Sequence, residues 1–506
     1  MNKANKKRRS ILLIQPPSIL QRLQRLKSRK PEIEAPLPFV YISPYLIDAG
    51  FQVHILDLRI DSVSMLETYL HETPPLIAGI SVMPGSMLRE TIKLTKLIKC
   101  LSPSTRVLWG GTFPSLHYQI CLQVRELDFV VCGDGEITLT ELASALAESA
   151  DMTSFENIKG LAYVRDGLPF ATPPREPVNL EYRPIGAWHL LEKYIPYYLN
   201  SSSLLSINTA RGCPYRCTFC YNTAIYRGFN RYRTKSIDAV LEEVRYLHAR
   251  YIPQILIFMD DDFLANRNRG YQLLSTINRN FPELRYRIDA RVNELTERKV
   301  VKQLATEGLE SVFFGVEGVS REFLDHIKKG CETEATFEAA KRCEENGIAG
   351  TYSFTCGYPN ENYQELFDRV EMATLLTAMH RNSRCQMEII SPIIGTPVYA
   401  ELDQENLIPH DSIERWCHFS DWKSAADKPW IANGRFYEAF QLAFYVAFAG
   451  GSALDGGLRT LTQLLSNWAK YRLNGKQPRL LPEFQVANYF LKKMIWSGRN
   501  SLPASE

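Results

Sequence analysis

The sequence has few cysteines and little charge imbalance. Its 506 residues include only 11 cysteines, too few and too scattered for the disulfide framework of a secreted scaffold. The 59 basic residues nearly balance the 56 acidic ones, and a net charge of +3 gives no electrostatic basis for binding nucleic acid. We therefore predict neither a disulfide scaffold nor a nucleic-acid partner.

Long apolar runs are also lacking. The most apolar later segment, AFQLAFYVAFAGG at 439–451, is shorter than the roughly 18 residues that a membrane-spanning helix needs, and it is predicted as a buried helix. The run ILLI at 11–14 follows a basic stretch but is too short for the apolar core of a secretory signal. We predict a cytoplasmic protein without a transmembrane segment.

Five short runs rich in Ile, Val and Leu alternate with helical patterns in the first part of the chain. The runs lie at 10–17, 51–58, 75–83, 106–111 and 128–136. Nearly continuous apolar runs of this kind are typical of parallel strands buried on both faces. They predict a doubly wound, Rossmann-like sheet of five strands, which binds ligands at the carboxyl ends of its strands.

A second series of six strand-and-helix patterns follows. The strands are expected at 204–211, 254–261, 285–292, 311–317, 350–359 and 386–395. Because a closed TIM barrel has eight such units, six predict an open, partial (βα)6 barrel. The predicted α/β chain therefore has a Rossmann-like domain at 10–150, a linker at 151–195, the partial barrel at 196–400 and a helical C-terminal domain at 401–506.

Three cysteines stand close together in RGCPYRCTFCYN, directly after the first strand of the second series. They are Cys213, Cys217 and Cys220. A structural zinc site needs four ligands, and no fourth Cys or His lies nearby in the sequence. A redox CxxC pair would leave Cys213 without a role, whereas three thiolates on a 4Fe–4S cluster leave one iron open for another ligand. The spacing favours an iron–sulfur cluster over zinc.

The segment CPYRCTFC resembles the CxxxCxxC signature of the radical S-adenosylmethionine (radical SAM) enzymes, including the aromatic Phe219 before the third cysteine. The resemblance implies that the three cysteines bind a 4Fe–4S cluster whose open iron chelates S-adenosylmethionine (SAM). Reduction by an external one-electron donor such as flavodoxin or ferredoxin then yields a 5′-deoxyadenosyl radical, which takes hydrogen from a small-molecule substrate.

Later segments extend this resemblance. IFMDDDF at 257–263, DARVNEL at 289–295, GLESVFFGVEG at 308–318 and GTYSFTCGYP at 350–359 are similar to the second to fifth strands of the family. The resemblance implies that Arg291 and Glu317 hold the methionine or ribose part of SAM, with Phe219 and Tyr221 near its adenine. Gly318 stands where the family usually has a serine.

Two further side chains are weak candidates for a catalytic role. Asp261 lies in the acidic run at 260–262, which otherwise caps a helix and solvates a loop. Cys356 ends the predicted fifth strand, where a thiol that faces the substrate would be a hydrogen donor.

The first domain is similar to the cobalamin-binding domain of one radical SAM subgroup. Gly110 and Gly111 permit close approach of a bulky ligand, and Ser81 and Thr112 offer hydrogen bonds to a nucleotide tail. The sequence GDGE, from Gly133 to Glu136, resembles the Gly-Glu-Gly-Glu of that subgroup. The stretch DLRIDS at 57–62 has neither the His nor the Gly of the motif that supplies a lower axial ligand in other cobalamin methyltransferases.

The resemblance implies a cobalamin-dependent methyltransferase acting on an unactivated carbon of a small molecule or natural-product intermediate. One SAM methylates cob(I)alamin, and a second SAM supplies the radical. Two alternatives stay open: a radical SAM dehydratase, cyclase or rearrangement enzyme with a vestigial first domain, and a zinc-stabilised binding protein.

Overall fold

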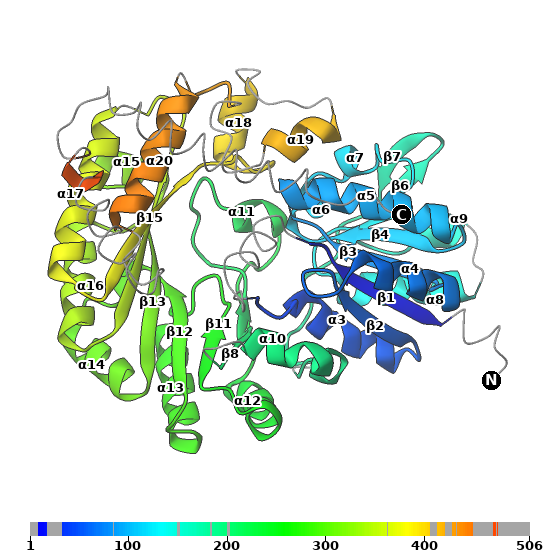
Figure 1. Cartoon of the computed structure of the whole chain (residues 1–506), viewed down its shortest axis with the longest axis horizontal. Coiled ribbons are helices and arrows are strands. Elements are labelled where there is room, and N and C mark those ends of the chain that lie inside the picture. The colour runs from blue at the N-terminus through cyan, green and yellow to red at the C-terminus, as the bar shows by residue number, and fades with distance from the viewer. Residues whose placement is uncertain are drawn as a thin grey trace. The chain divides into compact units, whose positions relative to one another are not determined.

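The computed structural model forms two compact units, residues 1–285 with 392–421 and residues 286–391 with 422–506. Figure 1 labels many of their helices and strands. The structure describes residues 9–17, 33–83, 85–148, 152–182, 185–199, 203–361, 363–404, 412–419, 428–431, 433–448, 469–471 and 473.

The first unit contains a seven-stranded sheet in the order β2–β1–β3–β4–β5–β6–β7. Its strands are β1 (Ser10–Gln15), β2 (Gln52–Asp57), β3 (Ile77–Ser81), β4 (Arg106–Gly110), β5 (Phe129–Val131), β6 (Leu161–Arg165) and β7 (Leu168–Ala171). The first five are parallel and confirm the five predicted strands. Their order, 2-1-3-4-5, is that of a doubly wound sheet, whose ligand site lies where the order reverses, between β1 and β3.

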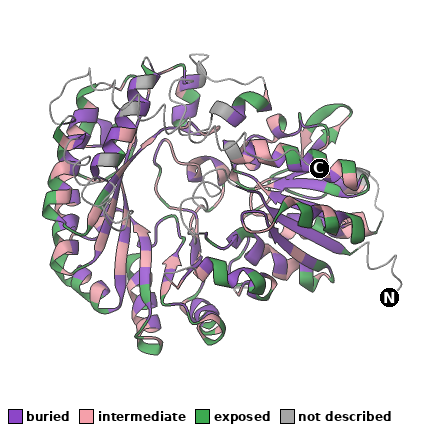
Figure 2. Cartoon of the chain, in the orientation of Figure 1, coloured by how far each residue is buried: buried purple, intermediate pink, exposed green. Residues whose placement is uncertain are grey.

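Helices cover this sheet, and β1 to β5 are mostly buried (purple in Figure 2). The helices are α3 (Leu37–Asp48), α4 (Val63–Glu72), α5 (Ser86–Leu101), α6 (Thr112–Leu116), α7 (Tyr118–Cys121), α8 (Gly135–Ala147) and α9 (Met152–Phe155). α3 packs against α8, and α4 packs against α5. All six residues of β1 are buried, which explains why this strand is a continuous apolar run in the sequence.

Two antiparallel strands extend the sheet into the segment predicted as a linker. β6 pairs with β5, and β7 pairs with β6. Asp166 and Gly167 join β6 to β7 with φ of 52° and 78°, the conformation that a two-residue hairpin turn requires and that Asp-Gly favours. The 3-10 helix η1 (Trp188–Tyr194) and α10 (Ile195–Leu199) follow. The segment 151–195 therefore contains regular structure that the sequence analysis missed.

The first unit also holds the start of the second strand series. β8 (Leu204–Ile207) pairs in parallel with β11 (Ile255–Phe258), and β9 (Ala210–Arg211) pairs antiparallel with β10 (Arg233–Thr234). The accompanying helices are α11 (Asn222–Ile225), α12 (Ile237–Tyr251), α13 (Arg267–Asn280), α18 (Pro397–Gln404) and α19 (Ile413–Phe419). Ser236 caps α12 by accepting a hydrogen bond from the Ala239 amide at 3.2 Å.

The second unit is a parallel sheet with helices. Its strands are β12 (Arg285–Ala290), β13 (Leu309–Glu317), β14 (Ala349–Cys356) and β15 (Ser383–Ile389). Its helices are η3 (Val292–Glu294), α14 (Arg298–Thr306), α15 (Arg321–His326), α16 (Thr333–Glu345), α17 (Tyr363–Met379) and α20 (Gly434–Phe448). All six strands predicted for the second series are thus present in the two units.

The apolar segment 439–451 forms a buried helix, as predicted, as far as residue 448. α20 packs on β15, and the side chains of Phe440 and Phe444 are fully buried. The described parts of 401–506 are mainly helical, and the rest of that predicted domain lies outside the described residues. Among the described helices, none has the length and apolar character needed to cross a membrane.

Candidate functional site

The three cysteines lie in the first unit, on the loop between β9 and α11. Cys217 is buried, Cys213 and Cys220 are partly buried, and all three are free thiols. Gly212 opens the loop with φ of 76°, and a Cβ at this position would stand 1.6 Å from the carbonyl oxygen of Arg231. Glycine is therefore required just before the first cysteine.

Hydrogen bonds brace the backbone of this loop. The Arg231 guanidinium donates to the carbonyl oxygens of Pro214 and Tyr215, at 3.2 Å each. The Thr223 hydroxyl donates to the carbonyl of Cys220 at 2.7 Å. Three thiols on one braced loop are a donor set that suits a 4Fe–4S cluster with one open iron. Within the described residues, no group of three or more His, Cys, Asp or Glu side chains is arranged so that it could hold a metal ion. The ligand role of the cysteines therefore stays a prediction.

The surroundings of Cys213 favour the neutral thiol. Burial raises the pKa of Cys213 to about 12, and the nearby Asp262, Cys220 and Asp261 act in the same direction. In the chain without a cofactor, this thiol is protonated at neutral pH. Because iron binds the thiolate, cluster binding would release this proton.

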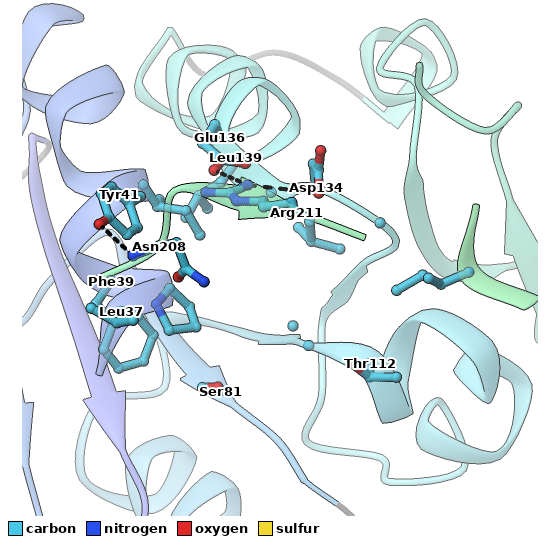
Figure 3. Close-up of a pocket in the computed structure, with 18 of the residues that line it drawn as sticks. Leu37, Phe39, Tyr41, Ser81, Thr112, Asp134, Glu136, Leu139, Asn208 and Arg211 are labelled. Carbon is cyan, nitrogen blue, oxygen red and sulfur yellow. Dashed lines mark hydrogen bonds and ion pairs between the residues drawn. The ribbon is translucent and has the colours of Figure 1, made fainter. Parts of the chain in front are cut away.

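A cavity of about 280 Å³ opens at the carboxyl ends of β3, β4 and β5, beside the end of β1 (Figure 3). Its lining includes all six residues predicted for cobalamin, namely Ser81, Gly110, Gly111, Thr112, Gly133 and Glu136. Residues that flank the cysteine loop, Arg211, Gly212 and Tyr221, also line it. One cavity thus borders both the first sheet and the cysteine loop.

The glycines leave this cavity open. No atom lies within 4 Å of the position that a Cβ would take at Gly110 or at Gly133. Ser81 and Thr112 lie on the side of the cavity opposite Arg211 and Glu136 (Figure 3). A cradle of bare backbone with hydroxyl groups at its edge fits a broad, flat ligand such as a corrin ring.

A buried ionic network links the cavity to the strand before the cysteine loop. Arg211 lies 2.6 Å from Glu136 and 3.7 Å from Asp134, and Arg233 lies 2.7 Å from Asp134. Burial alone would raise the pKa of Asp134, but Arg211 and Arg233 together hold it below its ordinary value. The carboxylate stays ionised, so these ion pairs tie the first turn of α8 to β9 and β10.

The stretch from Asp57 does not line the cavity. Arg59 binds the Asp57 carboxylate through two hydrogen bonds of 2.8 and 2.6 Å, and the Tyr198 hydroxyl donates to the same carboxylate at 2.9 Å. Arg59 stands where the axial-ligand motif has its histidine, and it forms a buried ion pair with Asp57. Among the described residues that line the cavity there is no histidine.

In the second unit, Glu317 ends β13 with φ of 69°, a conformation that costs roughly 1–3 kcal/mol for a residue other than glycine. Its carboxylate lies 3.0 Å from the buried ammonium of Lys329, and the Arg369 Nε donates to its carbonyl at 3.2 Å. A Cβ at Gly330 would lie 3.5 Å from the guanidinium of Arg291. Glu317 therefore contacts Lys329, and Arg291 lies near the next residue, Gly330.

Phe219 is partly buried within the cysteine loop and does not line the cavity. Cys356 ends β14 with a fully buried side chain, and burial raises the pKa of its thiol well above the ordinary value. Its role as a hydrogen donor stays a prediction. Asp261 binds the cysteine loop, accepting a hydrogen bond from the Gly212 amide at 2.9 Å.

The sequence analysis missed several residues of the cavity. Tyr41 on α3 donates to Glu243 at 3.2 Å and accepts from the Asn208 amide at 3.2 Å, and both Tyr41 and Asn208 line the cavity. Arg211 directly precedes Gly212 and Cys213, but no local pattern marked its side chain as part of the cavity. Tyr41 lies in an apolar helix and gave no signal, because its position depends on tertiary packing.

Comparison with known proteins agrees with both parts of this site. The model of the radical SAM superfamily matches residues 207–373, and the model of the B12 binding domain matches residues 31–143. The chain is a radical SAM protein with a B12-binding domain. The radical SAM domain spans the cysteine loop, Arg291, Glu317 and Cys356. It implies a 4Fe–4S cluster and SAM as cofactors, and the B12-binding domain implies cobalamin.

Two relatives and one solved structure extend the comparison of this radical SAM protein. An uncharacterised methyltransferase of Pyrococcus horikoshii is 28% identical and covers 74% of this chain and 79% of its own. An anaerobic magnesium-protoporphyrin IX monomethyl ester cyclase of Synechocystis is 24% identical, with 79% of each chain covered. The radical SAM methyltransferase TsrM of Kitasatospora setae, with cobalamin and a [4Fe–4S] cluster bound, superposes with a TM-score of 0.64 at 22% identity, covering 78% of this chain and 75% of its own. The predicted α/β fold class is confirmed.

Proposed function

We propose that this radical SAM protein is a cobalamin-dependent methyltransferase that acts on an unactivated carbon of a small molecule. The cavity carries this proposal, because one opening is bordered by the cradle for a corrin ring and by residues that flank the cysteine loop. A vestigial first domain would fill that space with side chains. Here Gly110 and Gly133 keep it open.

When bound, the cluster with SAM supplies a 5′-deoxyadenosyl radical, and the corrinoid supplies the methyl group. The residues of this chain would hold these groups. Cys213, Cys217 and Cys220 hold the cluster; Phe219, Tyr221, Arg291 and Glu317 hold SAM; and the residues of the cavity hold the corrinoid. Each turnover then uses two SAM molecules and two electrons, which an external donor such as flavodoxin or ferredoxin provides. The need for such a donor favours a cytoplasmic location.

A second candidate is a radical SAM cyclase or rearrangement enzyme that transfers no methyl group. The similarity to the Synechocystis cyclase over 79% of each chain favours it. Both candidates use the same cluster, so product analysis must separate them.

The test is anaerobic reconstitution with iron, sulfide and hydroxocobalamin, followed by assay with SAM and a strong one-electron reductant. The methyltransferase is expected to form S-adenosylhomocysteine even without a substrate, because transfer of the first methyl group needs only the reduced corrinoid. Formation of 5′-deoxyadenosine without S-adenosylhomocysteine would contradict methyl transfer and favour the second candidate. Protein that binds zinc and takes up no iron would exclude both.

A further inference from the structure

Asp261 contacts both ends of the three-cysteine loop. Its Oδ2 accepts a hydrogen bond from the backbone amide of Gly212, at 2.9 Å, one residue before Cys213. Its Oδ1 accepts a hydrogen bond from the hydroxyl of Tyr221, one residue after Cys220. A single carboxylate at the end of β11 therefore closes the loop into a ring.

The neighbouring Asp260 binds a different part of the chain. It is buried, and it accepts hydrogen bonds from the amides of Thr209 at 2.6 Å and Ala210 at 2.9 Å. It also accepts a hydrogen bond from the Thr209 hydroxyl. These contacts fix the chain between β8 and β9, upstream of the cysteines. Replacement of Asp261 therefore removes the closure of the loop and leaves this anchor intact.

We propose that Asp261 is a positioning residue, which holds the cysteine loop closed before the cluster is inserted. This inference rests on the proposed function only in taking the three cysteines as ligands of the cluster. A flexible loop loses conformational freedom when three of its residues are fixed on one ligand, and a loop closed in advance loses less. Closure by Asp261 thus makes cluster binding more favourable.

The hydrogen bonds of Asp261 also lie at the wall of the cavity. Asp261, Gly212 and Tyr221 all line the cavity that borders the first sheet. The hydrogen bonds that close the loop therefore also form part of the wall of that cavity. An opened loop is expected to loosen that wall.

The first test uses protein without cofactors, so it does not depend on the cluster. Asp261→Asn and Asp261→Ala are compared with wild type by hydrogen–deuterium exchange of peptides that cover residues 211–222. Both variants are expected to speed exchange in this segment at least tenfold. Tyr221→Phe, which removes one hydroxyl, is expected to give a smaller increase. Asp238→Asn, an exposed aspartate in the first turn of α12, is the matched control and should leave exchange in the segment unchanged.

The second test measures iron uptake and the electron paramagnetic resonance spectrum of the reduced cluster with SAM. Asp261→Ala is expected to bind less than half the iron of wild type and to give an altered spectrum, with unchanged exchange at Thr209 and Ala210. Exchange and iron uptake within twofold of wild type in both Asp261→Ala and Tyr221→Phe would overturn the inference. Wild-type protein that takes up no iron contradicts the proposed function instead, and the exchange of the apoproteins still decides whether Asp261 closes the loop.

Discussion

Gly110 controls how closely a ligand approaches the end of β4. A Cβ added at this position would have no protein atom within 4 Å, so a larger side chain would extend into the cavity. We expect Gly110→Val to leave the melting temperature of the apoprotein nearly unchanged. It should weaken hydroxocobalamin binding at least tenfold, about 1.4 kcal/mol, because the valine occupies the place of the ligand.

Equilibrium titration followed by absorbance measures this loss, and Gly110→Ala should show a smaller one. Equal corrinoid affinity in the valine variant and the wild type would show that the ligand does not rest on this strand end.

The partly buried carboxyl of Glu388 on β15 should make the stability of the second unit depend on pH. Burial raises the pKa of its carboxyl to about 6, from an ordinary value of 4.5. The folded state therefore binds more protons than the unfolded state between these values, and stability falls as the pH rises from 4.5 through 6. The difference of about 1.5 pKa units corresponds to at most about 2 kcal/mol.

We expect Glu388→Gln to be more stabilising at pH 7.5 than at pH 4.5, as measured by chemical denaturation at both values. Glu371→Gln, at an exposed position of α17, is the control and should show no such difference. An equal effect of Glu388→Gln at both pH values would contradict the burial of this carboxyl.

At the scale of single elements, the N-terminus of α12 is stabilised by one side chain, that of Ser236. Ser236 accepts a hydrogen bond from the Ala239 amide and donates one to Glu181 at 2.8 Å. We expect Ser236→Ala to lower the free energy of unfolding by about 1 kcal/mol, because the amide of the first turn loses its acceptor.

Ser62 offers a matched control, because it occupies the same position before α4 without making a capping hydrogen bond. Thermal unfolding should show a decrease of roughly 2–4 °C for Ser236→Ala and a smaller change for Ser62→Ala. Equal shifts would mean that the cap at α12 contributes nothing specific.

The strands were predictable wherever burial leaves its pattern in the sequence. β1 and β3 are apolar runs because both of their faces are covered, and α12 shows its buried face as Val240, Leu241, Val244 and Leu247. The β6–β7 hairpin was missed because its strands are short and partly exposed, so only the Asp166–Gly167 turn marked it.

The site was predictable to a similar extent. Cys213, Cys217 and Cys220 share one short motif, and the residues of the cavity stand at strand ends that a doubly wound sheet brings together. Tyr41, Asn208 and Arg211 reach the same cavity from other elements. Only the tertiary contacts of the first unit establish that arrangement, so no local pattern announced it.

At the scale of the whole molecule, the cavity proposed to hold the corrinoid is lined by residues of the first unit alone. The lining comes from β1, from the ends of β3, β4 and β5, from α3 and α8, and from the segments on either side of the cysteine loop. A ligand bound there should therefore stabilise the first unit. At a concentration one hundred times its dissociation constant, the expected gain is about 2.7 kcal/mol.

Hydrogen–deuterium exchange of the full chain with and without hydroxocobalamin tests this distribution. We expect slower exchange at 79–83, 108–113, 131–139 and 208–226, because these segments supply the wall of the cavity. Peptides from 300–380 in the second unit should exchange as before, and Gly110→Val should abolish the protection. Protection concentrated in the second unit would place the corrinoid elsewhere.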